Sequence, residues 1–200
     1  LFYYRRHESN LTNKQERILF ARRQIKLDNV QEKLTRVKPV IAVIPCRKYF
    51  DFVEDLWSER IGESTLLETS IECCMDSSLI DTIIVSSDNP EIRRITDKYD
   101  QNKVKVNIRD TKSTIRSISI VPTLRKCIQE YDHNYKGITV MRYLQTPFVQ
   151  SSILDEAITT LLFSQADSAC GVQIVDDTIY ENTSYGLKQL DGAGNTIRSE

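Results

Sequence analysis

Short apolar runs alternate with amphipathic stretches along most of the chain. Val40–Ile44 is apolar throughout, which is typical of a strand buried on both faces of a sheet. Leu66–Met75 has helical periodicity, and β-branched residues dominate the next run, Thr82–Ser86. The same alternation predicts further strands at 104–106, 138–141 and 169–174, and further helices at 88–99, 122–131 and 152–163. Ser152 and Asp155 are spaced to cap the last of these helices. Strands and helices that alternate over short links predict an α/β fold, with a Rossmann-like, mainly parallel sheet flanked by helices.

A basic helix is expected ahead of this alternation. Thr12 and Gln15 are spaced as a capping box, an imperfect apolar stripe follows, and Pro39 disfavours helical geometry at Lys38. Residues 1–38 carry a net charge of +6, whereas the remaining residues carry −7. This change in net charge predicts an N-terminal segment over 1–38 and a second domain over 39–200. Because acids interrupt the basic face, the sequence favours a solvated interdomain helix over a surface for membranes or nucleic acids.

Composition and cysteine usage narrow the class of protein. The chain is 40% apolar and 28% charged, and its apolar runs are far shorter than the roughly 20 residues of a membrane helix. Its five cysteines are odd in number and form no CxxC pair, which predicts reduced, mostly buried thiols in a cytoplasmic protein. The chain starts at Leu1 without a secretory leader, so we expect a mature or excised fragment. Near its end, Asp191-Gly192 and Gly194-Asn195 predict a hairpin turn.

Parallel sheets bind ligands beyond the carboxyl ends of their strands. Residues that follow the predicted strands are therefore the candidates for chemistry. They fall in the segments 45–64, 86–90, 107–120 and 142–151.

Several segments, in the same order, resemble the acylneuraminate (CMP-sialic acid) cytidylyltransferase family. Ile41–Arg47 reads IAVIPCR and resembles the family's opening IAIIPAR, and Leu66–Glu72 resembles its first core helix. Ser78–Asp88 is similar to SGLFDEVIVSTD. The family's TSPLR, DEAI and ADS segments resemble Thr146-Pro147, Asp155–Ile158 and Ala166–Ser168. The resemblance covers roughly residues 41–190 and implies a fold of the nucleotide-diphospho-sugar transferase type.

This resemblance also implies an activity. Family members make CMP-activated nine-carbon acidic sugars from CTP and the sugar, with release of pyrophosphate and with Mg²⁺. It thus implies a nucleotidyltransferase with CTP and a nonulosonic acid as substrates and Mg²⁺ as cofactor, the metal ligands being unknown. It implies a homodimer as well, formed through an extension largely beyond this chain.

Site residues are assigned by their place after the predicted strands. Arg47 is the candidate catalytic and phosphate-binding residue, with a surface salt bridge as the alternative. The candidate nucleotide-binding residues are Arg47, Lys48, Ser86, Ser87 and Asp88. Asp88 is equally well placed as a helix N-cap. Gln145 and Thr146 are the candidates for contact with the sugar or the base.

The loop after the first strand departs from the family's pattern. The family has RGGSK there, whereas in this chain both glycines are absent and Asp51 replaces the lysine. Asp51, Glu54 and Asp55 would repel a triphosphate, and Tyr49 lacks the conformational freedom of glycine. Residues 142–149 read RYLQTPFV in place of LQPTSPLR, which also weakens the second signature.

Two alternatives follow from these departures. One is a catalytically inactive module for binding or dimerisation, fused to a glycosyltransferase. It agrees with Tyr3–Thr12, which resembles the tail of family 2 glycosyltransferases. The other is a nucleotidyltransferase of the same fold that uses a different nucleotide or sugar.

Overall fold

The computed structural model describes residues 15–50, 53–109, 119–172, 180–184 and 186–189 of the 200-residue chain. The chain divides into two compact units, Leu1–Ala169 and Cys170–Glu200. The first unit contains the sheet with its helices, and the second contains a β-hairpin.

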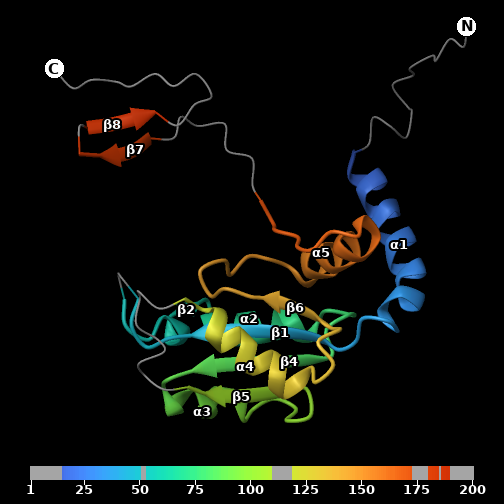
Figure 1. Cartoon of the computed structure of the whole chain (residues 1–200). Coiled ribbons are helices and arrows are strands. Elements are labelled where there is room, and N and C mark those ends of the chain that lie inside the picture. The colour runs from blue at the N-terminus through green and yellow to red at the C-terminus, as the bar shows by residue number, and fades with distance from the viewer. Residues whose placement is uncertain (1–14, 51–52, 110–118, 173–179, 185, 190–200) are drawn as a thin grey trace, which may run out of the picture. The chain divides into compact units, whose positions relative to one another are not determined.

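The core of the first unit is a four-stranded sheet in the order β5-β4-β1-β6, in which every neighbouring pair is parallel (Figure 1). Its strands are β1 (Val40–Cys46), β4 (Thr82–Ser87), β5 (Val104–Ile108) and β6 (Ile138–Met141). Ala42 of β1 lies opposite Ile83 of β4 and Val140 of β6. The predicted parallel α/β fold is confirmed.

Side chains alternate between the two faces of the sheet. Val40, Ala42 and Ile44 of β1 belong to the larger core, together with buried residues of α2 (Leu66–Met75) and α5 (Ser151–Ser164). Ile41 and Val43 belong to a second core with Cys127 of α4 (Val121–Tyr131). The chain runs β1, β4, β5 in one direction and then returns past β1 to β6. Right-handed crossovers in opposite directions place their helices on opposite faces, which explains the two cores.

Shorter elements connect the strands. A 3₁₀ turn, η2, and a two-stranded ribbon, β2 with β3, lie between β1 and α2. Another 3₁₀ turn, η3, leads into α3 between β4 and β5. Their bounds are η2 (Leu56–Ser58), β2 (Arg60–Ile61), β3 (Ser64–Thr65), η3 (Pro90–Ile92) and α3 (Arg93–Thr96).

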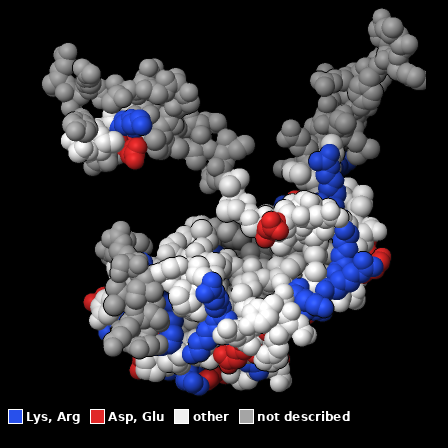
Figure 2. Space-filling view, viewed as in Figure 1, with Lys and Arg blue, Asp and Glu red and all other residues white. Residues whose placement is uncertain are grey.

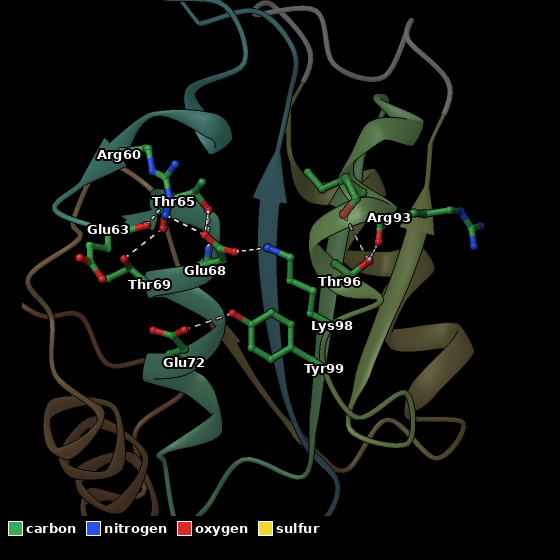
Figure 3. Close-up of polar contacts among 11 residues, drawn as sticks. Arg60, Glu63, Thr65, Glu68, Thr69, Glu72, Arg93, Thr96, Lys98 and Tyr99 are labelled. Carbon is green, nitrogen blue, oxygen red and sulfur yellow. Dashed lines mark hydrogen bonds and ion pairs between the residues drawn. The ribbon is translucent and has the colours of Figure 1, made fainter.

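The start of α2 is fixed by a capping box that also ties it to the segment after α3 (Figure 3). Thr65 N donates to Glu68 Oε2 at 2.9 Å, and Glu68 N donates to Thr65 Oγ1 at 3.2 Å. Lys98 Nζ lies 2.6 Å from Glu68 Oε1, and Tyr99 donates its hydroxyl to Glu72 at 3.3 Å. The Lys98 ammonium, with the Thr65 N–H, lowers the pKa of Glu68 to about 2.

The basic N-terminal helix, α1 (Gln15–Leu34), packs on α5. Arg23 Nε lies 2.7 Å from Glu156 Oε2, and Lys26 Nζ donates to Thr160 Oγ1 at 3.0 Å. Figure 2 shows Lys and Arg along the visible face of α1. A helix ahead of Pro39 is confirmed, but part of its expected solvated face is engaged by α5. The expected cap at Thr12 lies outside the described residues.

The expected capping of α5 by Ser152 and Asp155 is wrong. The helix begins at Ser151 after Gln150, which provides no side-chain cap. Asp155 is buried in the second turn and accepts hydrogen bonds from Ser77 Oγ at 2.5 Å and Ser78 Oγ at 2.8 Å. The carboxylate therefore accepts the hydroxyl groups of the turn after α2, a role that the spacing within α5 did not indicate.

The core strand expected at 169–174 is also absent from its described part. Residues 169–172 form no strand, and Val172 is 88% exposed. An apolar run becomes a strand only where another strand offers an edge for pairing, and none pairs with these residues. In the second unit, β7 (Tyr180–Thr183) and β8 (Gly186–Gln189) form an antiparallel pair. The turn predicted around 191–195 lies outside the described residues.

The structure also bears on hydropathy and on cysteine burial. In the described part of the chain, no helix combines the length and the apolar character needed to cross a membrane. All five cysteines are free, and four are buried, whereas Cys170 is exposed.

Candidate functional site

The carboxyl ends of three adjacent strands bring together two arginines and an aspartate. Arg47 follows β1, Asp88 follows β4 and Arg109 follows β5. Arg109 N donates to Ser87 O at 2.8 Å, which continues the strand pairing, and its guanidinium donates to Thr123 Oγ1 at 3.3 Å. Burial lowers the pKa of Arg109, the Asp88 carboxylate opposes that change, and the Arg47 charge adds to it. The three residues follow neighbouring parallel strands, and the Asp88 and Arg47 charges both act on the Arg109 guanidinium, so we treat them as one charged cluster.

Cations at the end of β1 lie against aromatic rings. The Arg47 guanidinium is 4.7 Å from the centroid of the Phe50 ring, and Lys48 Nζ is 5.0 Å from that of Tyr49. The Tyr49 hydroxyl raises the pKa of Lys48. The carboxylates of Glu54 and Asp55 also act on the Lys48 ammonium, which is exposed enough for water to screen it.

The loop from Arg47 to Ser58 is closed by its own hydrogen bonds. Asp55 N donates to Lys48 O at 2.6 Å, and Phe50 N donates to Val53 O at 2.9 Å. Asp55 has a φ of 48°, in the left-handed region that aspartate tolerates better than most residues. Its Oδ1 accepts from Trp57 Nε1 at 2.8 Å and from Asn89 Nδ2 at 3.0 Å. The loop is thereby fastened to the end of β4.

Asp88 is engaged with this loop. Its Oδ1 accepts a hydrogen bond from the backbone N–H of Lys48 at 3.0 Å. The residue that caps the following turn is Asn89, whose Oδ1 accepts from Glu91 N at 3.0 Å. The N-cap alternative proposed for Asp88 is therefore wrong, because the aspartate faces the loop after β1.

Ser86 and Ser87 are both fully buried. Ser86 Oγ donates to Asn107 Oδ1 at 3.4 Å across the pair β4–β5. Ser87 Oγ accepts from Asn89 N at 3.0 Å. Both hydroxyls thus bind neighbouring groups of the protein, and their predicted contact with a nucleotide remains a prediction.

The other candidate residues follow β6. Thr146 Oγ1 accepts from the Arg142 guanidinium at 2.7 Å and donates to Tyr143 O at 3.1 Å. Gln145 is exposed beside it. Because β6 pairs with β1 in parallel, these residues lie at the same edge of the sheet as Arg47.

This edge also contains the topological switch point of the sheet. The chain leaves β1 toward β4 and β5, and it returns to the opposite side of β1 to form β6. Open parallel sheets bind ligands in the crevice at such a point, which here lies between the ends of β1 and β6. Arg47 is therefore the member of the charged cluster that follows the strand next to β6, whose loop contains Gln145 and Thr146.

Arg109 and Arg142 are two site residues that the sequence reasoning did not single out. Each directly follows a strand, within the segments 107–120 and 142–151 already indicated as places for chemistry. A rule that takes the first charged residue after each parallel strand would have found both.

The described residues provide no complete set of side-chain ligands for the expected Mg²⁺. Among them, no three His, Cys, Asp or Glu side chains lie close enough together to hold a metal ion. Asp88, which lies at the cluster, already accepts the Lys48 N–H. Asp51, another acid of the loop after β1, lies outside the described residues.

Solved structures with a similar fold support this description of the sheet. A CMP:2-keto-3-deoxy-manno-octonic acid synthetase, solved in complex with CTP, matches with a TM-score of 0.54 and 12% identity. The match covers 64% of this chain and 49% of the synthetase, so the chain spans about half the length of that protein. A 4-diphosphocytidyl-2C-methyl-D-erythritol synthase matches with a TM-score of 0.51 and 17% identity, over 78% and 70% of the two chains. The corresponding synthase of Anaerococcus prevotii DSM 20548 matches with a TM-score of 0.50 and 15% identity. This match covers 83% of this chain and 65% of the synthase.

Sequence comparison identifies the family. No curated protein sequence matches the chain. The profile of the family described as cytidylyltransferase matches residues 58–196, which is more than half of the chain. The match starts at the end of the loop that departs from the predicted pattern, and it includes β4, β5 and β6. The chain belongs to the cytidylyltransferase family.

Proposed function

We propose that this chain is a nucleotidyltransferase domain that binds CTP at the carboxyl ends of β1, β4 and β5. The observation that carries the proposal is the convergence of Arg47 and Arg109 on one edge of the sheet, beside Lys48. A triphosphate needs several positive charges in a partly dry site, where each is worth more than in water. Family membership supports a cytidine nucleotide as the ligand.

The acceptor in this proposal is an acidic sugar of the nonulosonic class, bound beside Gln145 and Thr146. A hydroxyl oxygen of the sugar forms a bond to the α-phosphorus of CTP. The bond from that phosphorus to the bridging oxygen of the β-phosphate breaks, pyrophosphate leaves, and the hydroxyl proton passes to water. The residues of the chain contribute by orienting the two substrates and neutralising phosphate charge.

Calorimetric titration of CTP into the protein tests the proposal, in parallel with and without Mg²⁺. We expect micromolar binding that weakens at least about tenfold in Arg47→Ala, because one charge contact with phosphate contributes about 1.4 kcal/mol or more. Arg36→Ala is the matched control, since this exposed arginine pairs with Glu32 on α1. If the wild-type protein binds none of CTP, ATP and GTP, the nucleotidyltransferase proposal is overturned.

One observation favours a second candidate, an inactive nucleotidyltransferase-fold module fused to a glycosyltransferase. The N–H groups of Lys48, Phe50 and Asp55 already donate to acceptors within the protein. A phosphate-binding loop would direct such groups to the ligand. In this candidate, residues 1–38 connect a glycosyltransferase to the domain at 39–200. It predicts that no nucleotide binds while the longer protein still self-associates.

The remaining proposals rest on the family resemblance. They are Mg²⁺ as the metal, a homodimer as the assembled state and the cytoplasm as the location. The titration with and without Mg²⁺ tests the first, because a metal-dependent site binds CTP more tightly when the ion is present. Sedimentation analysis of the chain and of a longer protein tests the second.

A further inference from the structure

We infer that Arg142 is a positioning residue that fixes the loop after β6 and makes it selective for an anionic acceptor. The inference rests on the proposed function and specifies the part of the site that would receive the sugar. Arg142 is only 2% exposed, so its side chain would not touch the acceptor. It would act on the acceptor through the loop that it holds and through its positive charge.

Arg142 holds the loop at three points. Its backbone N–H donates to Val43 O of β1 at 3.0 Å, which fixes the residue at the end of the sheet. One guanidinium nitrogen donates to Tyr143 O at 2.6 Å and to Thr146 Oγ1 at 2.7 Å, and the other donates to Pro147 O at 3.5 Å. A planar guanidinium can bind several acceptors at once in a fixed geometry, which a lysine cannot.

Other contacts complete the anchoring of the same loop. Leu144 is fully buried, and Cys73 of α2 donates its thiol to Val149 O at 3.0 Å. Three residues of this loop are nevertheless exposed: Gln145, Thr146, whose hydroxyl is held by Arg142, and Phe148, which is 82% exposed. A backbone fixed from inside, with polar side chains outside, is a preorganised binding surface.

The charge of Arg142 has no counter-ion in the described part of the chain. Among the described residues, no carboxylate lies within 4.0 Å of its guanidinium, which donates to neutral oxygens and also interacts with the thiol of Cys73. Its buried Nε has no hydrogen-bond partner among them. Burying an unpaired cation is unfavourable, and a nearby anion offsets that cost. Thr146 connects the buried guanidinium to the exposed surface, so an anion bound beside Thr146 and Gln145 lies in its positive field.

The test compares a nonulosonic acid with its methyl ester, which has the same sugar without the negative charge. We expect the wild-type protein to bind the acid about tenfold more tightly than the ester. In Arg142→Met, which removes the charge at similar side-chain volume, the two affinities should come within about twofold of each other. Arg142→Lys, which keeps the charge, should retain the preference for the acid. Lys136→Met is the matched control, because Lys136 is an exposed cation before β6, at the opposite edge of the sheet.

Amide hydrogen exchange of residues 144–149 tests the positioning role separately. We expect faster exchange in Arg142→Met, in Arg142→Lys and in Thr146→Val, which removes an acceptor at an exposed site where the fold is not at risk. Thr146→Ser should restore slow exchange because it keeps the hydroxyl.

The outcomes distinguish this inference from the proposed function. Unchanged exchange in Thr146→Val, or an acid preference that survives in Arg142→Met, overturns the inference. It is also overturned if the wild-type protein does not prefer the acid. If the acid preference is present but CTP does not bind, the proposed function is overturned and the role of Arg142 stands.

Discussion

The loops after β1 and β6 leave the same edge of the sheet from neighbouring strands, yet they are held in opposite ways. Two aspartates hold the first: Asp88 accepts the Lys48 N–H, and Asp55 accepts from Trp57 and Asn89. A buried arginine holds the second by donating to its carbonyl and hydroxyl oxygens. In the first loop, backbone N–H groups are used internally. In the second, carbonyl oxygens are used internally and polar side chains stay exposed.

This difference gives the two loops different electrostatic surroundings, which suit different ligands. The first loop presents Arg47 and Lys48 next to carboxylates that oppose a triphosphate. The second has a positive interior with no described carboxylate within ion-pair distance of Arg142, which suits an anionic acceptor. In the proposed function, CTP binding therefore depends mainly on whether the aspartates that hold the first loop permit a triphosphate to bind.

The largest change in stability is expected from Asp55→Ala. This substitution leaves two donors without their acceptor and places alanine at a left-handed φ of 48°. We expect a loss of about 2–3 kcal/mol in the free energy of unfolding, measured with urea. Asp55→Asn is the control, since it keeps an oxygen acceptor and tolerates this conformation, and should lose less than about 1 kcal/mol. Equal losses in the two variants would contradict this role of Asp55.

Asp88→Asn tests whether the carboxylate that holds the first loop opposes the nucleotide. The amide oxygen can still accept the Lys48 N–H, while the negative charge is removed. We expect CTP to bind about tenfold more tightly at low ionic strength, with a smaller gain at high salt. Weaker binding would instead support the sequence prediction that Asp88 contacts the nucleotide directly. Titration calorimetry at two salt concentrations measures the difference.

A smaller, pH-dependent effect on stability is expected from Glu68, which caps the start of α2. Folding lowers the pKa of Glu68 from 4.5 to about 2, mainly through Lys98. Its contribution to stability is therefore fully present above pH 4.5 and is lost as the pH falls toward 2. Glu68→Gln should lose about 1 kcal/mol at pH 7, because exposure of the Lys98 side chain weakens the ion pair.

The corresponding measurement is urea unfolding of the wild type and Glu68→Gln between pH 7 and pH 2. The two stabilities should converge as the pH approaches 2. Glu91→Gln is the matched control, because its ion pair with Arg94 is exposed and should contribute little at any pH. A constant difference across the range would show that Glu68 acts as a neutral cap only.

Much of the fold could be predicted from the sequence because it depends on local patterns. The helix Leu66–Met75 and the strand Ile138–Met141 have the predicted bounds, since each follows from a continuous apolar or amphipathic pattern. The pattern failed at Asp155 and at residues 169–172, where the outcome depended on distant partners. A buried polar group takes whichever partner the fold brings near, which its neighbours in sequence do not specify.

The sequence by itself determined which residues follow the strands, and therefore that Arg47, Asp88, Gln145 and Thr146 would lie at one edge of a parallel sheet. Only the tertiary structure decided the strand order β5-β4-β1-β6, which places the arginines after β5 and β6 on opposite sides of β1. It also decided that Asp88 binds the Lys48 N–H and that Arg142 is buried without a described counter-ion. Periodicity is a local property of the chain, whereas burial and charge compensation depend on residues that meet only after folding.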